Sequence, residues 1–171
     1  MDIYVTIEER YVQAVEELRY GEAAKALRLF NDLVASDESY ARAYFQLGII
    51  NFYYIKDYQA AGYYFNRCIE TEPGFPDVYE DFMKLLVFLN MEKKAKNIAA
   101  RSLQIAGTNQ RLIYQQLGLL EEKGQRWNAA LDYYRKAYSY SLEKDDAEDS
   151  KADIQRVKDK MSQASKFVYN Y

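Results

Sequence analysis

The sequence predicts an all-α fold, a solenoid of about four stacked helix hairpins closed by a C-terminal helix. Three observations predict it. Small residues that begin an apolar helical stripe recur every 34 or 35 residues. Only 2 Pro and 7 Gly occur among the 171 residues, so helices can run without interruption. The last part of the chain is rich in charge yet keeps one apolar stripe at helical spacing, which is typical of a helix with one face in solvent.

The repeat is clearest in the second helix expected of each hairpin. Ala26, Ala61, Ala95 and Ala130 stand 35, 34 and 35 residues apart. Two further residues lie on the same helical face as each alanine, four and seven positions after it. The first of these are Phe30, Phe65, Ala99 and Tyr134, and the second are Leu33, Cys68, Ser102 and Ala137. The small residues in this pattern predict that the paired helices pack closely against one another.

A second set of residues marks the first helix of each later hairpin. The pairs Leu47-Gly48, Phe82-Met83 and Leu117-Gly118 recur at 35-residue intervals, about a dozen residues before each alanine. Polar or Gly residues then follow, where a helix should end. The expected turns are Lys56-Asp57-Tyr58, Asn90-Met91-Glu92 and Gly124-Gln125-Arg126-Trp127.

These markers predict a single domain over residues 1–171. Its repeats fall at about 7–40, 41–75, 76–109 and 110–144, and a capping helix follows at about 146–168. The capping helix should lay an apolar stripe on the last repeat, formed by Ile154, Val157, Met161, Ala164 and Val168. We expect the last residues, 169–171, to fray.

The residues of these units resemble the tetratricopeptide repeat. The fourth unit is the best match, with Tyr114, Leu117, Gly118, Trp127, Ala130, Tyr134 and Ala137 at the signature positions. The second unit matches at Tyr44, Leu47, Gly48, Tyr58, Ala61, Phe65, Cys68 and Pro73, but has one extra residue before its turn. The third departs at Met83, Ala99 and Gly107, and the first lacks a clear Leu-Gly pair. The resemblance, over about residues 7–144, implies a right-handed α-solenoid that binds other proteins.

The composition argues against catalysis. The chain has no His and one Cys, so the commonest general base is missing, and neither an intrachain disulfide nor a Cys-rich metal cage can form. Cys68 lies in the small-residue stripe, where packing is its expected role. Adjacent acids such as Glu121-Glu122 point about 100° apart on a helix, so we interpret them as solvated faces rather than as a catalytic pair. We expect no catalytic residue, no metal, no cofactor and no enzymatic activity.

The near balance of positive and negative charge argues against two classes of binding partner. The net charge is −3, from 23 basic and 26 acidic side chains, and no cluster of Lys and Arg escapes neighbouring acids in the sequence. Neither nucleic acid nor an anionic membrane surface is therefore an expected partner. No apolar run approaches the roughly 20 residues of a membrane span, and residues 1–6 show no secretory signal. A single thiol fits a reducing compartment, so we expect a cytoplasmic protein.

The resemblance also implies where a partner would bind, because the free face of each first helix lines the concave wall in this family. In the second repeat this helix is apolar nearly all round, and Phe45, Ile49 and Phe52 form a stripe apart from Leu47 and Gly48. A helix that is apolar on every side is either buried or binds a partner. The expected groove residues are Phe45, Ile49, Phe52, Tyr53, Lys84, Val87, Phe88, Leu112 and Leu119.

The sequence thus predicts a scaffold or adaptor that holds a protein or peptide ligand in this groove. Two other uses of the apolar face stay open, namely burial by the chain's own N- or C-terminal segment and burial in a homodimer. A second function class is a small chaperone of secretion substrates, similar to the helical-repeat chaperones of type III secretion, whose usual core has three repeats. An enzyme is the third class, and no nucleophile–base pair supports it.

Overall fold

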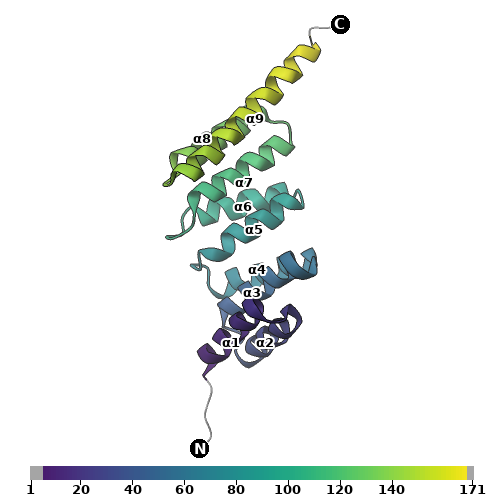
Figure 1. Cartoon of the computed structure of the whole chain (residues 1–171), viewed down its shortest axis with the longest axis vertical. Helices are drawn as coiled ribbons and strands as arrows, with labels where there is room; N and C mark the ends of the chain where they lie inside the picture. The colour runs from purple at the N-terminus through teal and green to yellow at the C-terminus, as the bar shows by residue number, and fades with distance from the viewer. Residues whose placement is uncertain (1–5, 169–171) are drawn as a thin grey trace, which may run out of the picture. The chain divides into compact units, whose positions relative to one another are not determined.

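All regular secondary structure in the described part of the chain is helical (Figure 1). The computed structural model describes residues 6–168, and the side chains within this range as far as residue 164. The predictions for residues 1–5, for the side chain of Val168 and for the end of the chain, 169–171, lie outside this description. The chain divides into two compact units, residues 1–78 and 79–171.

Two helix hairpins form the first unit. The first hairpin pairs α1 (Ile7–Tyr20) with α2 (Ala23–Ser36). The second pairs α3 (Ala41–Ile49), which continues as the π-helical segment η1 (Ile50–Ile55), with α4 (Tyr58–Thr71). Each hairpin lies within one of the ranges predicted as repeats.

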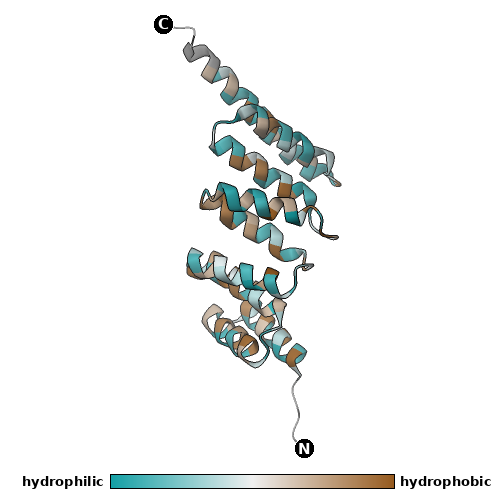
Figure 2. Ribbon diagram, turned by 180° about the vertical axis from the view of Figure 1, so that it is seen from behind, coloured by the Kyte–Doolittle hydropathy of each residue, from teal (hydrophilic) through white to brown (hydrophobic). Residues whose placement is uncertain are grey.

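The second unit continues the pattern and ends with one long helix. Its elements are α5 (Asp77–Phe88, which begins just before the division), α6 (Glu92–Ser102), α7 (Gln110–Lys123), α8 (Trp127–Ser139) and α9 (Lys144–Val168). Every helix carries both hydrophobic and hydrophilic residues (Figure 2), so one face can pack while another meets solvent. The all-helical class and the hairpin pairing predicted from the sequence are confirmed.

Polar side chains fix the start of several helices. Thr6 and Glu9 form a reciprocal capping box at α1, in which each side chain bonds to the backbone amide of the other residue. The side chains of Asp57 and Asn109 accept hydrogen bonds from backbone amides in the first turns of α4 and α7, at 2.9 and 3.2 Å. These bonds satisfy amides that have no partner within the helix.

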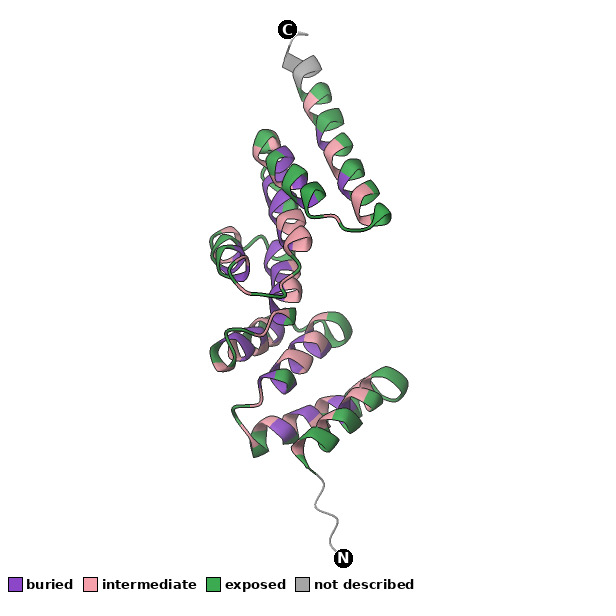
Figure 3. Cartoon of the chain, turned by 90° about the vertical axis from the view of Figure 1, so that its left-hand side faces the viewer, coloured by how far each residue is buried: buried purple, intermediate pink, exposed green. Residues whose placement is uncertain are grey.

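The repeating stripe of the second helices forms the interior of each hairpin. All twelve residues of that stripe are at most 1% exposed, including the polar Ser102. In Figure 3 the buried residues run as stripes along the faces where paired helices meet. The recurrence of small residues in the sequence therefore marks real helix contacts.

Glycine allows the closest of these contacts. A Cβ atom added to Gly48 would lie 2.4 Å from the ring of Phe65, and one added to Gly118 would lie 2.7 Å from the ring of Tyr134. In each case an aromatic ring of the second helix packs directly against the backbone of the first. In the third hairpin the corresponding positions hold Met83 and Ala99, both buried. There the large side chain comes from the first helix and the small one from the second.

We expect Gly48→Ala to destabilise the protein by about 2 kcal/mol, because the new methyl group must displace the Phe65 ring. Urea unfolding followed by circular dichroism measures the change. Gly74→Ala is the matched control, because no atom lies within 4 Å of a Cβ added there. Equal unfolding midpoints for the two variants would contradict the close crossing.

The last helix, α9, covers the final hairpin through its apolar stripe. Val157 is fully buried in a cluster with Ala130, Leu131 and Tyr134. Ile154, Met161 and Trp127 are partly buried and pack against the same cluster. Ile154, Val157 and Met161 therefore make the contact predicted for the capping helix, whereas Ala164, predicted to lie in the same stripe, is exposed.

Two adjacent acids on α7 are buried, and the interpretation of this pair as a solvated face is wrong. Glu121 and Glu122 are 3% and 6% exposed. Glu121 forms ion pairs with Lys96 of α6, at 2.8 Å, and with Arg126. Because neighbouring helical residues point in different directions, Glu122 faces the other side and meets α8 and α9.

Glu122 is the centre of a charged network that fastens α9. Arg156 donates to both of its carboxylate oxygens, from Nε at 2.9 Å and from Nη2 at 2.7 Å. Lys160 Nζ donates at 2.8 Å, and the Tyr134 hydroxyl donates at 2.6 Å. Burial opposes the ionised carboxylate, but these hydrogen bonds outweigh it and lower the pKa of Glu122 to about 2.

The depressed pKa predicts an acid-sensitive contribution to stability. Ionised Glu122 contributes fully above the ordinary carboxyl pKa of 4.5, and the contribution is lost as the pH falls to about 2. We expect Glu122→Gln to lower the free energy of unfolding by about 3 kcal/mol at neutral pH. Denaturant unfolding between about pH 7 and pH 2 should show a smaller acid loss for this variant than for the wild type.

Glu148→Gln is the control for this experiment. Glu148 is exposed and pairs with Lys144 at 3.6 Å, so its removal should change the free energy of unfolding by less than about 0.5 kcal/mol. An acid slope in Glu122→Gln equal to that of the wild type would refute the role of the network.

Candidate protein-binding surface

The groove residues expected in the first unit follow one another along α3 and η1. Phe45, Ile49 and Phe52 are half-buried, and Tyr53 is 40% exposed. The ring of Phe45 packs edge-on against Phe75, with ring centroids 5.4 Å apart. The ring centroid of Phe45 also lies 6.3 Å from that of Phe65 in α4, so Phe45 contributes to the packing of its own hairpin as well as to the surface.

The extra residue of the second repeat is accommodated by η1. In a π-helix each backbone hydrogen bond spans five residues instead of four, so one additional residue fits without ending the helix. Lys56 then adopts the left-handed conformation, with φ 66°. Asn90 and Gln125, at the corresponding turns of the next two hairpins, have φ 55° and 57°. The insertion therefore changes the end of the helix and leaves the turn unchanged.

As a result, η1 presents three consecutive large side chains to solvent. Tyr53, Tyr54 and Ile55, named here the η1 patch, are 40%, 55% and 49% exposed. Phe52 supports the patch from below, with its ring centroid 4.5 Å from that of Tyr53 and 6.1 Å from that of Tyr58. The sequence pattern predicted Tyr53 as a groove residue but not Tyr54 or Ile55. The extra residue before the turn was the available signal, because it predicts a local change of helical twist.

In the second unit, α5 supplies three of the predicted residues, and they differ in environment. Phe88 is 53% exposed, whereas the side chain of Val87 is buried, at 1% exposed, and is therefore not part of an open groove. Lys84 lies between two carboxylates, 2.6 Å from Glu80 and 3.4 Å from Asp81. Burial disfavours its charge, but the two carboxylates outweigh burial and raise the pKa of Lys84. The lysine is therefore charged but already neutralised by its neighbours.

The end of α7 lies beside the end of α5. Lys123 Nζ donates to the backbone carbonyl of Val87 at 2.7 Å and to that of Phe88 at 3.4 Å, which satisfies carbonyls at the helix end. Leu119, 37% exposed, lies one turn before Lys123 on the same face. Leu112 is half-buried at the start of the helix. Phe88 and Leu119 thus form the exposed apolar part of this surface.

The C-terminal helix occupies part of the same face of α7. Gln115 Nε2 donates to Asp153 of α9 at 3.0 Å, and Glu122 is held by Arg156 and Lys160 of α9. The helix α9 therefore covers Gln115 and Glu122, which lie on the same helical face as the expected groove residues Leu112 and Leu119.

The single cysteine of the chain lies away from solvent. Cys68 is fully buried, and burial raises the pKa of its thiol to about 12, so the nucleophilic thiolate is not formed at neutral pH. Among the residues that the structure describes, no three or more acidic or Cys side chains are grouped so that they could hold a metal ion. No helix in that part of the chain combines the length and the apolar character that a bilayer crossing requires.

Comparison with known proteins finds likeness in three-dimensional structure. No family model and no curated protein matches the sequence. A crystal structure of MamA is 26% identical, covers 79% of this chain and 73% of MamA, and has a TM-score of 0.69. PilF of Pseudomonas aeruginosa is 13% identical, with 92% and 69% of the two chains covered and a TM-score of 0.76.

A third structure connects the likeness to the repeat. YrrB, described as a TPR protein with an unusual peptide-binding site, is 16% identical. The match covers 91% of this chain and 88% of YrrB, with a TM-score of 0.67. The paired helices, their period and these likenesses agree, and the chain therefore has the tetratricopeptide-repeat fold.

Proposed function

We propose that this chain is a non-enzymatic scaffold or adaptor that binds a protein or peptide partner through the outward face of α3 and η1. Phe88 and Leu119 form a separate exposed apolar surface within the second unit. Tetratricopeptide-repeat proteins are in general protein-interaction scaffolds. The observation that carries the proposal is the η1 patch, where three adjacent large side chains are 40% to 55% exposed. Exposed apolar clusters of this kind mark interaction sites.

The patch suits partner binding because its side chains are large and held in place. Tyrosine provides a wide contact area at a low cost in conformational entropy, since few of its bonds rotate. The packing of Phe52 against Tyr53 and Tyr58 holds the base of the patch before a partner arrives. The secretion-chaperone alternative gains no support, because α7 and α8 complete a fourth hairpin.

We expect the double variant Tyr53→Ser, Ile55→Ser to weaken partner binding by about 2 kcal/mol, because both side chains lose desolvated contacts. Affinity capture from the source organism with mass spectrometry identifies the partner, and calorimetric titration of that partner measures the change. Circular dichroism of the variant should match the wild type, since both residues are exposed.

The double variant Val12→Ser, Tyr20→Ser is the control, because it removes an exposed aliphatic and an exposed tyrosine from α1 of the same unit. It should keep wild-type affinity. An equal loss in both variants, or no loss in the η1 variant, would refute the binding surface. Light scattering on both variants shows whether the partner is a second copy of the chain.

A further inference from the structure

The helix α6 is basic although the protein as a whole is acidic. Within its 11 residues lie Lys93, Lys94, Lys96 and Arg101 but only one acid, Glu92. The net charge of the whole chain is −3. Such a local excess of one sign attracts groups of the opposite sign.

Glu92, the single acid of α6, already has ion-pair partners on one side of the helix. Glu92 pairs with Lys96 at 2.8 Å and with Arg126 at 3.0 Å. Lys96 also pairs with the buried Glu121 at 2.8 Å. These four residues form a network between α6, α7 and the turn before α8, and it leaves no carboxylate of α6 for the other lysines.

The remaining cations of α6 lack carboxylate partners. Lys93 and Arg101 are exposed, and Lys94 lies over the ring of Phe82 with its Nζ 5.1 Å from the ring centre. Within residues 6–164 none of the three forms an ion pair. The expectation that neighbouring acids neutralise every basic cluster is wrong for this helix. The sequence held the signal, because three lysines and an arginine follow Glu92 with no second acid before Ser102.

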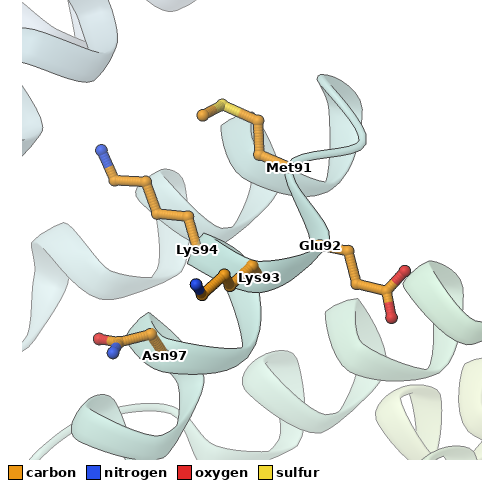
Figure 4. Close-up of a pocket in the computed structure, with 5 residues that line it drawn as sticks. All are labelled: Met91, Glu92, Lys93, Lys94 and Asn97. Atoms are coloured by element: carbon orange, nitrogen blue, oxygen red, sulfur yellow. The ribbon is translucent and has the colours of Figure 1, made fainter.

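An apolar depression adjoins these cations. A shallow pocket of about 500 Å³ is lined by Met91, Glu92, Lys93, Lys94 and Asn97. Figure 4 shows Met91, Lys94 and Asn97 directed to one side of the helix and Glu92 to the other. Met91 is 43% exposed, and Leu89 in the same turn is 38% exposed. The depression is open to solvent, and the flexible thioether of Met91 adapts to different apolar shapes.

We propose that this face of α6 is a docking site for an acidic peptide segment of another protein, with carboxylates near Lys93 and Lys94 and an apolar side chain against Met91. Charge complementarity selects the acidic partner. The pocket selects a peptide over a polyanion, because a nucleic acid is held mainly through many phosphate contacts and a lipid surface through larger basic clusters.

The α6 site and the η1 patch lie in different units and use different forces. The η1 patch is apolar and aromatic, whereas the α6 site combines two lysines with one apolar contact. Loss of either surface should therefore leave binding at the other unchanged, and the two proposals can fail separately.

The test uses the full chain and a short fluorescein-labelled peptide of glutamates that flank a Leu-Phe pair. Fluorescence anisotropy measures its binding to wild type and to the double variant Lys93→Glu, Lys94→Glu. We expect binding to the wild type, a loss of about tenfold or more in the variant, and weakening of wild-type binding by added salt. The same peptide with glutamine in place of every glutamate should bind as weakly as the variant does.

Three further variants complete the test. Lys151→Glu with Lys158→Glu is the matched control, because Lys151 also lies over an aromatic ring, that of Tyr138, and Lys158 is also exposed. This control and the η1 variant Tyr53→Ser, Ile55→Ser should bind as the wild type does. The milder Lys93→Gln, Lys94→Gln should give an intermediate loss, and circular dichroism verifies that each variant is folded.

The proposal is overturned if the wild type does not bind the acidic peptide, or if the glutamine peptide binds equally well. It is also overturned if the control variant loses as much affinity as the α6 variant. Tighter binding to phosphatidylserine vesicles or to a single-stranded oligonucleotide than to the peptide would assign the surface to a different class of partner.

Discussion

The close approach of a glycine and an aromatic ring in the second and fourth hairpins is the contact on which the other surfaces depend. Where Phe65 packs against Gly48 and Tyr134 against Gly118, the first helix cannot rotate about its axis without a clash. The faces of the first helix that point away from that contact are therefore turned outward in a fixed way. The exposed apolar residues of the first helices are Tyr53, Tyr54 and Ile55 in the second hairpin and Leu119 in the fourth. The position of the candidate binding surface is thus a consequence of core packing.

The sequence predicted the hairpins well because helix crossings need small residues, and small residues at a regular interval are visible without coordinates. It could not predict the burial of Glu122, because Arg156 and Lys160 follow more than thirty residues later and only the return of α9 brings them close. It did not place Tyr54 and Ile55 at the surface, since their exposure depends on the π-helical twist. The single domain over 1–171 and the binding role of the groove residues stay predictions.

Adjacent acids illustrate how one sequence pattern can have different structural outcomes. Glu8 and Glu9, at the start of α1, are exposed, and Glu9 caps the helix. Glu121 and Glu122 lie near the end of α7, where neighbouring helices approach from two sides and each supplies cations. Both members of the second pair hold helices together, one toward α6 and the other toward α9. The two pairs differ in burial because different helices surround them, and the neighbouring residues in the sequence do not predict this.

The segment η1 has a consequence for how such a repeat can diverge. Successive residues of a helix are about 100° apart, so one added residue presents a new set of side chains beyond it. Because Lys56 restores the same turn that Asn90 and Gln125 make, the following helix still meets its partner in the usual register. A single codon gained or lost at this point would replace the chemistry of the outer face while the hairpin stays intact. The partner specificity of this surface could then evolve through insertion or deletion of a residue rather than through substitution.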